Sequence, residues 1–163
     1  MRLKDKVAIV VGAGQTPGDT FGNGRATAIL FAREGARVLL VDNNFESVQE
    51  TQRLIEAEGG TCSAVKADFT NQQDCESFVR AAKQTYGRVD VLHNNVGIGG
   101  ANDEILSLPE ESWDRIMTVN LKGMFLSCRS VLPVMREQKS GAIINISSIA
   151  AVCSTGIVAY KTS

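Results

Sequence analysis

The chain has 163 residues, enough for one domain that buries roughly 70% of its unfolded surface without metal or disulfide cross-links. Apolar residues make up 44% and charged residues 21%, which excludes a disordered, collagen-like or coiled-coil chain. A net charge of −1 and the lack of any basic cluster argue against nucleic-acid binding. No apolar run approaches the ~18 residues of a membrane span, and the first residues carry no secretory pattern, so the sequence predicts a cytoplasmic protein outside the membrane.

The cysteines lie far apart in the sequence, and the chain holds a single histidine. They are Cys62, Cys75, Cys128 and Cys153, and none belongs to a Cys-x-x-Cys pair. We therefore expect free thiols in a reducing compartment and no metal site.

The predicted strands share short, continuous apolar runs rich in β-branched residues, as strands buried on both faces do. They are residues 7–11, 37–41, 62–66, 89–93 and 142–147. Between them, apolar residues spaced three and four apart predict helices. These cover residues 25–34, 46–58 and 109–135, together with a helix that Thr70 and Gln73 begin as a capping box and that closes near Gly87.

The alternation of strand and helix predicts parallel βαβ units, and hence an α/β fold with one open sheet and helices on both of its faces. In such sheets, ligands bind beyond the carboxyl ends of the strands. The residues that follow each strand are therefore candidate ligand contacts.

A glycine-rich turn follows the first strand. Glycines let backbone amides approach a pyrophosphate, and the N-terminus of the next helix adds a partial positive charge. Two registers of this turn are possible, one with Gly12, Gly14 and Gly18 and the other with Gly12, Gly22 and Gly24. We prefer the second, because a segment as rich in glycine as residues 18–24 would make a poor helix.

Polar residues follow each of the next three strands. Asp42 follows the second strand, where a carboxylate can accept a hydrogen bond from a ribose 2′-hydroxyl and would repel a 2′-phosphate, so NAD is favoured over NADP. Asp68 follows the third strand, and Asn94 to Gly97 follow the fourth. Each alone is ordinary turn chemistry, but their repetition at one edge of the sheet favours a dinucleotide site.

In their order and spacing, these residues resemble the motifs of the short-chain dehydrogenase/reductase family over the whole chain. The family's glycine motif matches Gly12, Gly22 and Gly24, its acidic cofactor selector matches Asp42, and its adenine-contacting aspartate matches Asp68. Its Asn-Asn-Ala-Gly motif is present as Asn94-Asn95-Val96-Gly97, with valine in place of alanine. The resemblance implies a Rossmann-like, doubly wound parallel sheet in three αβα layers, with strand order 3-2-1-4-5. The residues it implies for the cofactor are Gly12, Gly22, Asn23, Gly24, Asp42, Asp68, Phe69, Asn95, Val96, Gly97 and Tyr160.

The resemblance also gives catalytic roles to Asn120, Ser148 and Tyr160. It implies that Tyr160 carries the proton, that Ser148 holds the substrate oxygen, and that Asn120 supports a proton relay and bends its helix. A free phenol has a pKa near ~10 and needs positive charge nearby to act as a base at neutral pH. Without the resemblance, these residues would be interpreted as a strand-ending serine, a buried amide and a packed aromatic ring.

The resemblance therefore implies one dinucleotide-binding domain over residues 1–163 and an NAD-dependent oxidoreductase that interconverts a secondary alcohol and a ketone. A homodimer or homotetramer is expected. The mostly apolar stretch from residue 149 to residue 158 favours a neutral substrate. The alternative function is a non-catalytic dinucleotide-binding module or an inactive fragment, and Asp42 opposes an NADP enzyme.

Two features depart from the family pattern. The glycine loop is longer than usual, with extra residues from Gln15 to Phe21. The family also has a lysine four residues after its tyrosine, whereas this chain ends at Ser163. We therefore expect a C-terminally incomplete domain that is inactive when made as residues 1–163 alone.

Overall fold

Val7–Val11 forms the central strand β1, and each of its side chains is at most 1% exposed. Strand β1 pairs in parallel with β2 on one side and β4 on the other. The sheet runs β3-β2-β1-β4-β5, so the predicted strand order is confirmed. Its other strands are β2 (Arg37–Asp42), β3 (Thr61–Lys66), β4 (Val91–Asn94) and β5 (Ala142–Asn145). The computed structural model describes residues 1–99, 104–153 and 158–163.

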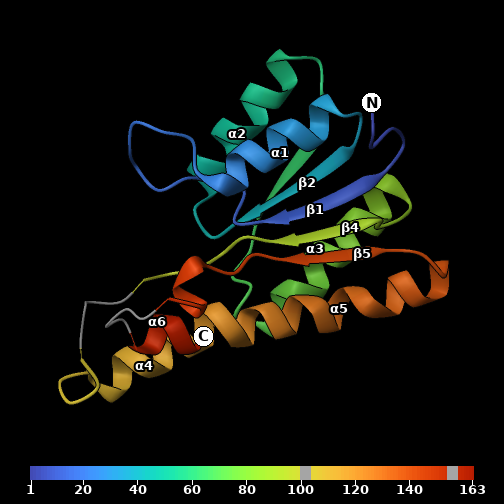
Figure 1. Cartoon of the computed structure of the whole chain (residues 1–163). Helices are drawn as coiled ribbons and strands as arrows, with labels where there is room; N and C mark the ends of the chain where they lie inside the picture. The colour runs from blue at the N-terminus through green and yellow to red at the C-terminus, as the bar shows by residue number, and fades with distance from the viewer. Residues whose placement is uncertain (100–103, 154–157) are drawn as a thin grey trace.

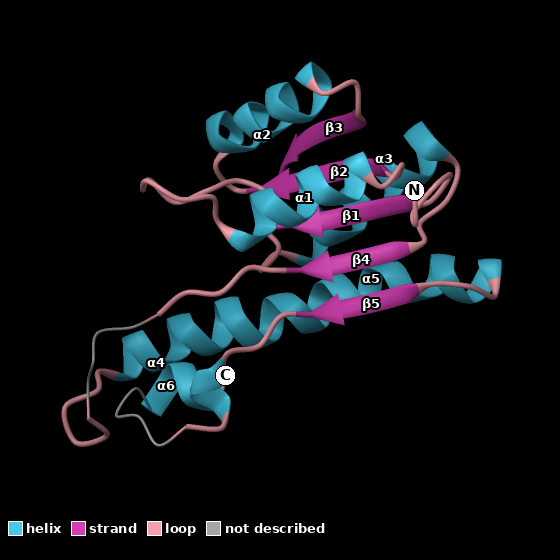
Figure 2. Cartoon of the chain, turned by 45° about the horizontal axis from the view of Figure 1, so that its top comes forward, coloured by secondary structure: helices cyan, strands magenta, loops and turns pink. Residues whose placement is uncertain are grey.

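Helices cover both faces of the sheet (Figure 2), which confirms the three-layer αβα arrangement. One face carries α1 (Asn23–Arg33) and α2 (Phe45–Ala57), and the other carries α3 (Gln72–Tyr86) and α5 (Gly123–Gln138). Short elements extend beyond the carboxyl end of β5 (Figure 1): α4 (Glu110–Ile116), η1 (Met117–Lys122), η2 (Ile149–Ala151) and α6 (Val158–Thr162). None of the described helices is both long enough and apolar enough to cross a bilayer.

The two faces of the sheet bury separate hydrophobic cores. Ile9 and Leu39 belong to the core shared with α3 and α5, whereas Val10 and Leu40 belong to the core shared with α1 and α2. The alternation follows from strand geometry, in which successive side chains point to opposite faces. The unbroken apolar pattern of the central strands is therefore the consequence of burial on both sides.

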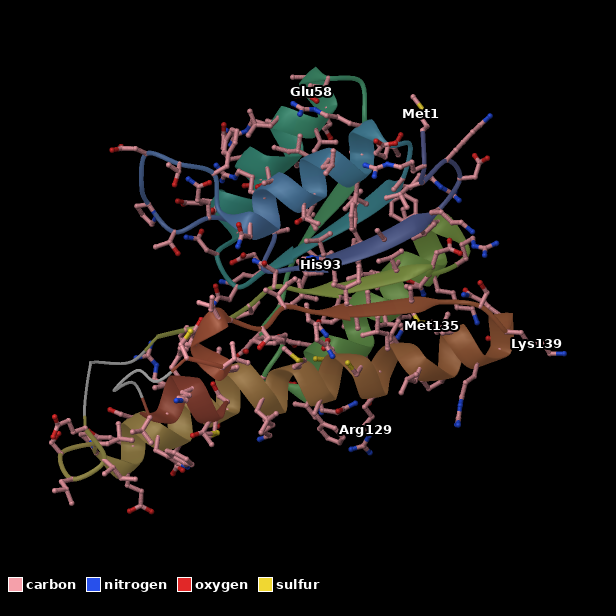
Figure 3. The ribbon with its side chains drawn as sticks, in the orientation of Figure 1. Met1, Glu58, His93, Arg129, Met135 and Lys139 are labelled. Atoms are coloured by element: carbon pink, nitrogen blue, oxygen red, sulfur yellow. The ribbon has the colours of Figure 1, made fainter. Side chains whose placement is uncertain are left out.

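Helix α5 shows how a surface helix divides its side chains between the core and solvent. Met135 points toward the sheet and is 6% exposed, whereas Arg129 lies on the outer side of the helix (Figure 3). This helix closes the lower layer under β4 and β5 in the view of Figure 1.

Two predicted helical features are wrong in detail. The side chain of Asn71, not that of Thr70, caps α3 by accepting hydrogen bonds from the backbone N–H groups of Gln73 and Asp74. The hydroxyl of Thr70 instead donates to Asp68, at 2.7 Å. The single helical tract predicted over residues 109–135 is divided by the π-helical segment η1, and its last part continues to Gln138.

Asp90 ties three strands together at the amino edge of the sheet. Its carboxylate accepts hydrogen bonds from the backbone N–H of Val7 and from two nitrogens of Arg88, at 2.6–2.9 Å. Its backbone N–H donates to the carbonyl of Val7, and its carbonyl accepts from the N–H of Ala142. Residues 89 and 90 were predicted as strand but precede β4, because Asp90 takes part in this junction.

Candidate active site

The parallel strands end level with one another at the carboxyl edge of the sheet. Val11, the last residue of β1, lies opposite Val41 in β2 and opposite Asn94 in β4, and Asn94 in turn lies opposite Asn145 in β5. The loops that leave these positions therefore start side by side. This register places the candidate residues after β1, β2 and β4 along one edge.

The glycine turn is packed directly against the loop after β4. Gly12 has φ +79°, a conformation that side chains rarely adopt, and a Cβ at this position would lie 2.9 Å from the side chain of Val96. A Cβ on Gly24 would lie 2.8 Å from Nδ2 of Asn95 and would overlap the carbonyl of Gly12. Gly12, Gly24, Asn95 and Val96 thus form one tightly packed cradle at this edge of the sheet.

Helix α1 begins with Gly22 as its N-cap residue and Asn23 as its first residue. This start confirms the register built on Gly12, Gly22 and Gly24. The residues from Gln15 to Phe21 form a loop that projects away from the sheet at the left of Figure 1. Because the N-terminus of a helix carries a partial positive charge, α1 directs an anion-binding end toward the carboxyl edge.

Asp42 lies at the end of β2 and already holds two backbone groups. One carboxylate oxygen accepts from the N–H of Gly14 at 2.8 Å, and the other accepts from the N–H of Asn44 at 2.9 Å. A Cβ on Gly14 would lie 2.7 Å from the carboxylate, so only glycine permits this approach. An ionised carboxylate has about four acceptor positions, so the side chain can still accept from a ligand hydroxyl.

The loop after β4 is fixed by Asn120 of η1. The side-chain oxygen of Asn120 accepts from the N–H of Ile98 at 2.8 Å, and its nitrogen donates to the carbonyl of Ile98 at 3.1 Å. Gly97 lies next to this pair, since a Cβ there would be 3.9 Å from the oxygen of Asn120. Asn120 is 7% exposed, so both hydrogen bonds are shielded from water. Asn120 lies within the π-helical segment η1, which interrupts the α-helical tract.

Asp68 and Phe69 follow β3 but take different positions. Asp68 is exposed, and its carboxylate accepts from the backbone N–H and the hydroxyl of Thr70, as a local turn residue does. The Phe69 side chain is 5% exposed and packs in the core against Gly123, where a Cβ would lie 2.6 Å from its ring. The structure therefore leaves only the backbone of Phe69 for contact with a ligand at the edge.

The three candidate catalytic residues lie on elements that contact one another. Helix α6, which carries Tyr160, contacts η1, which carries Asn120, and η2, whose N-cap is Ser148. The hydroxyl of Ser148 accepts from the N–H of Ala150 at 3.2 Å, and a hydroxyl that accepts one hydrogen bond can also donate one. Residues 154–157, part of the apolar stretch expected to favour a neutral substrate, lie outside the described residues.

Asn120 is also tied to the helix of Tyr160 through Ser163. The side-chain nitrogen of Asn120 donates to the hydroxyl of Ser163 at 2.9 Å, and that hydroxyl donates to the carbonyl of Tyr160 at 3.0 Å. Two hydrogen bonds therefore connect η1 with the backbone of the candidate acid–base residue. Ser163 was missed from the sequence, where a lone serine carries no signal of this contact.

A pocket of ≈ 280 Å³ borders the site on the α1 side of the sheet. It is lined by Asn23, Ala26, Thr27, Leu30, His93, Asn95 and Ile146. His93 is 5% exposed, its ring meets that of Phe31 edge to face, and burial holds its pKa below the ordinary value. His93 therefore packs as part of the wall of this pocket. Within residues 1–99, 104–153 and 158–163, no cluster of three or more His, Cys, Asp or Glu side chains could hold a metal ion.

Residues 6–163 match the sequence profile of the family described as short chain dehydrogenase. A 2-(R)-hydroxypropyl-CoM dehydrogenase from Xanthobacter autotrophicus is 39% identical over 97% of this chain and 62% of its own length. A solved structure of a putative short-chain dehydrogenase/reductase from Burkholderia xenovorans is 40% identical, with TM-score 0.94 over 99% of this chain and 64% of that protein. A xylitol dehydrogenase solved with NAD+ bound is 30% identical, with TM-score 0.91 over 99% of this chain and 60% of its own. The chain thus spans a little over three fifths of the length of these proteins.

Proposed function

Because the chain belongs to the short-chain dehydrogenase family, we propose that it is the dinucleotide-binding domain, residues 1–163, of an NAD-dependent oxidoreductase. The enzyme transfers hydride between the nicotinamide and a secondary alcohol or ketone, with Tyr160 as the general acid–base. The observation that carries this proposal is the cradle formed by Gly12, Gly24, Asn95 and Val96 beside the N-terminus of α1.

The cradle fits the diphosphate of a dinucleotide. The absence of a Cβ at Gly12 and at Gly24 lets α1 pack closely on β1 and on the loop after β4. This packing brings the amides of the helix N-terminus to the carboxyl edge of the sheet, where they can bind a phosphate. Asn23 and Gly24 supply these amides, directly after the N-cap residue Gly22. Asn95, Val96 and Gly97 form the opposite wall, which leads to Asn120.

The position of Asp42 favours the binding of NAD over that of NADP. It stands one strand away from the cradle, at the position where the ribose of an adenine dinucleotide is held in this fold. Its carboxylate can accept from a 2′-hydroxyl and repels a 2′-phosphate. Asp68 and the backbone of Phe69 lie after the neighbouring strand β3, where they would contact the adenine.

The catalytic chemistry belongs to Ser148, Tyr160 and Asn120. When bound, the cofactor supplies or accepts the hydride. Ser148 donates its hydroxyl hydrogen to the substrate oxygen, and Tyr160 removes the hydroxyl proton of an alcohol or returns it to a ketone. Asn120 fixes the loop after β4 and, through Ser163, the backbone of Tyr160, so that both walls of the site keep their spacing.

Three further properties complete the proposal. The substrate is a neutral alcohol or ketone, which the mostly apolar stretch from residue 149 to residue 158 favours. The protein is a homodimer or homotetramer, for which the exposed apolar residues Leu121, Phe125 and Leu132 of η1 and α5 provide a contact surface. It works in the cytoplasm, where its free cysteines stay reduced.

The test is to mix the purified protein with NAD and a panel of secondary alcohols while following the absorbance of the reduced cofactor. We expect turnover by the unsubstituted protein at its full natural length, and at least a thousandfold loss, on the order of a lost acid–base group, with Tyr160→Phe. Calorimetry should show that Tyr160→Phe still binds NAD. Binding of NAD without turnover of any alcohol in the panel would favour the non-catalytic dinucleotide-binding module. If the protein did not bind NAD, the proposal would be overturned.

A further inference from the structure

The extended glycine loop is closed at its base by one side chain. Gln15 stands at its start, and its side-chain oxygen accepts a hydrogen bond from the backbone N–H of Gly22 at 3.0 Å. The aliphatic part of Gln15 also lies against Gly22, since a Cβ there would be 3.9 Å from Cγ of Gln15. Gly22 is the N-cap residue of α1, so Gln15 holds the point at which the anion-binding end of the helix begins.

The backbone of Gln15 is itself fixed by α2. Its N–H donates to the hydroxyl of Ser47 at 2.7 Å, and that hydroxyl donates to the carbonyl of Gln15 at 3.0 Å. Ser47 follows three residues after the N-cap of α2 and is next to Gly14, whose N–H binds Asp42. Gln15 therefore connects the end of the site that carries Asp42 with the end that carries α1.

Between its two ends, the loop lies on the surface of the protein. Residues 16–21 are all exposed, and the Phe21 side chain is 62% exposed. A long loop without buried anchors leaves its ends free to separate, which would disorder the first turn of α1. The backbone of Gln15 is held at the start of the insertion and its side chain binds Gly22 at the end, so this one residue removes that freedom.

We propose that Gln15 is a positioning residue of the dinucleotide site, a clasp that holds the N-terminus of α1 in its binding geometry before the cofactor arrives. The clasp leaves the amides of Asn23 and Gly24 to the diphosphate and takes only that of Gly22. This inference rests on the proposed function, because it assigns Gln15 a part in binding the same ligand. Pre-organisation of this kind raises affinity by removing the cost of ordering the loop during binding.

The experiment compares Gln15→Ala with Gln52→Ala, a matched control on the outer surface of α2 whose side chain pairs with Glu56. Hydrogen exchange of the Gly22 amide, measured without cofactor, should become faster in Gln15→Ala and remain unchanged in Gln52→Ala. Titration with NAD should show affinity about two- to tenfold weaker for Gln15→Ala only, the range expected from losing one hydrogen bond. Unchanged exchange at Gly22, or unchanged affinity, would overturn the clasp.

Two further variants separate the clasp from a general loss of stability. Gln15→Glu keeps an acceptor oxygen, so it should restore the protection of Gly22, while its negative charge beside the diphosphate should weaken NAD binding more at low salt than at high salt. Ser47→Ala combined with Gln15→Ala should lose less affinity than the product of the two single losses, because both break one chain of contacts. A loss of NAD affinity in the double variant equal to the product of the two single losses would overturn the inference. If the unsubstituted protein does not bind NAD, the proposed function fails, and the exchange comparison, which needs no cofactor, still decides whether Gln15 holds Gly22.

Discussion

Gly24 lies so close to Gly12 that a methyl group on Gly24 would be 2.9 Å from the carbonyl carbon of Gly12 and would overlap its oxygen. The obstacle is backbone, which cannot turn away as a flexible side chain can. We expect Gly24→Ala to destabilise the protein by about 3 kcal/mol or more, which lowers Tm by roughly 6–12 °C. Gly18→Ala is the control, since a Cβ there meets nothing within 4 Å, and it should raise Tm by no more than about 4 °C. Equal Tm values for both variants, measured by thermal unfolding, would contradict the close packing of α1 on β1.

Asp42 should set the cofactor preference. The unsubstituted protein is expected to bind NAD about ten- to a hundredfold more tightly than NADP, the range of a charged hydrogen bond. Asp42→Ala should narrow this ratio toward one. It should also weaken both cofactors, because the N–H groups of Gly14 and Asn44 lose their acceptor and the glycine turn loosens. Glu46→Ala, which removes a neighbouring exposed carboxylate, is titrated with both cofactors as the control for net charge. Equal binding of NAD and NADP by the unsubstituted protein would contradict the role of Asp42.

Asn120→Ala should separate turnover from cofactor binding. The substitution removes both hydrogen bonds to Ile98 and the link to Ser163, so the helix of Tyr160 loses one of its ties to η1. We expect turnover to fall by about tenfold or more while the affinity for NAD changes less than about threefold. Hydrogen exchange at Ile98 should become faster. Asn71→Ala, which removes the cap of α3, should lower stability by about 1 kcal/mol and leave turnover unchanged.

Asp90 should make stability depend on pH in the acid range. Burial alone would raise the pKa of this carboxyl, but hydrogen bonds from Arg88 and the N–H of Val7, with the charge of Arg88 and Lys6, lower it below 3.8. A depressed pKa means that the ionised form stabilises the native state above pH 3.8, and that this contribution is lost as the pH falls through the lower native value.

Asp90→Asn tests this dependence. Near pH 7 the substitution should cost about 2–3 kcal/mol, because the Arg88 guanidinium and the N–H of Val7 lose a charged acceptor. The difference in unfolding free energy between the two proteins should shrink as the pH falls below 3.8. Denaturant titrations at several pH values give this difference directly, and a constant difference would contradict the assignment.

The thiols of Cys75 and Cys62 should react slowly in the folded protein. Burial, with the nearby carboxylates of Asp74, Asp68 and Glu76, raises the pKa of Cys75 to about 12, and burial with Glu56 raises that of Cys62 to about 11. Because the thiolate is the reactive form, neither residue should be alkylated quickly at pH 8 in the folded protein. Mass spectrometry should find Cys75 modified only after denaturation. Rapid modification of Cys75 under native conditions would show that the core around α3 opens readily.

How much of the structure the sequence predicts depends on how far apart in the chain the interacting residues lie. Val7–Val11 was predicted with its observed bounds, because burial on both faces leaves five consecutive apolar residues between Lys6 and Gly12. The start of α1 was predicted at Arg25, two residues after its observed first residue Asn23, because glycine-rich segments make poor helices. In both cases the decisive residues are neighbours in sequence.

The remaining features depend on contacts between distant residues. Asn71 rather than Thr70 caps α3, because the Thr70 hydroxyl binds Asp68 instead. The local sequence pattern does not decide which of these two neighbouring polar residues is the cap. The contact between Gln15 and Ser47 joins residues 32 positions apart, and the link from Asn120 to Ser163 spans 43. No local pattern pairs such residues, so the framework that supports the site became visible only in the fold.

The π-helical turn η1 also has a consequence for insertions and deletions. A π-helical turn contains one more residue than an α-helical turn, and each residue of an α-helix turns the chain by about 100°. Removing one residue from Met117–Val119 would let α4, η1 and α5 merge into a continuous α-helix, which is locally the more favourable form. It would also rotate the part before the deletion by about a quarter turn relative to Asn120, so that Asn120 and α4 could not both keep their present neighbours. The number of residues in η1 is therefore constrained by the position of the Asn120 side chain rather than by helix stability.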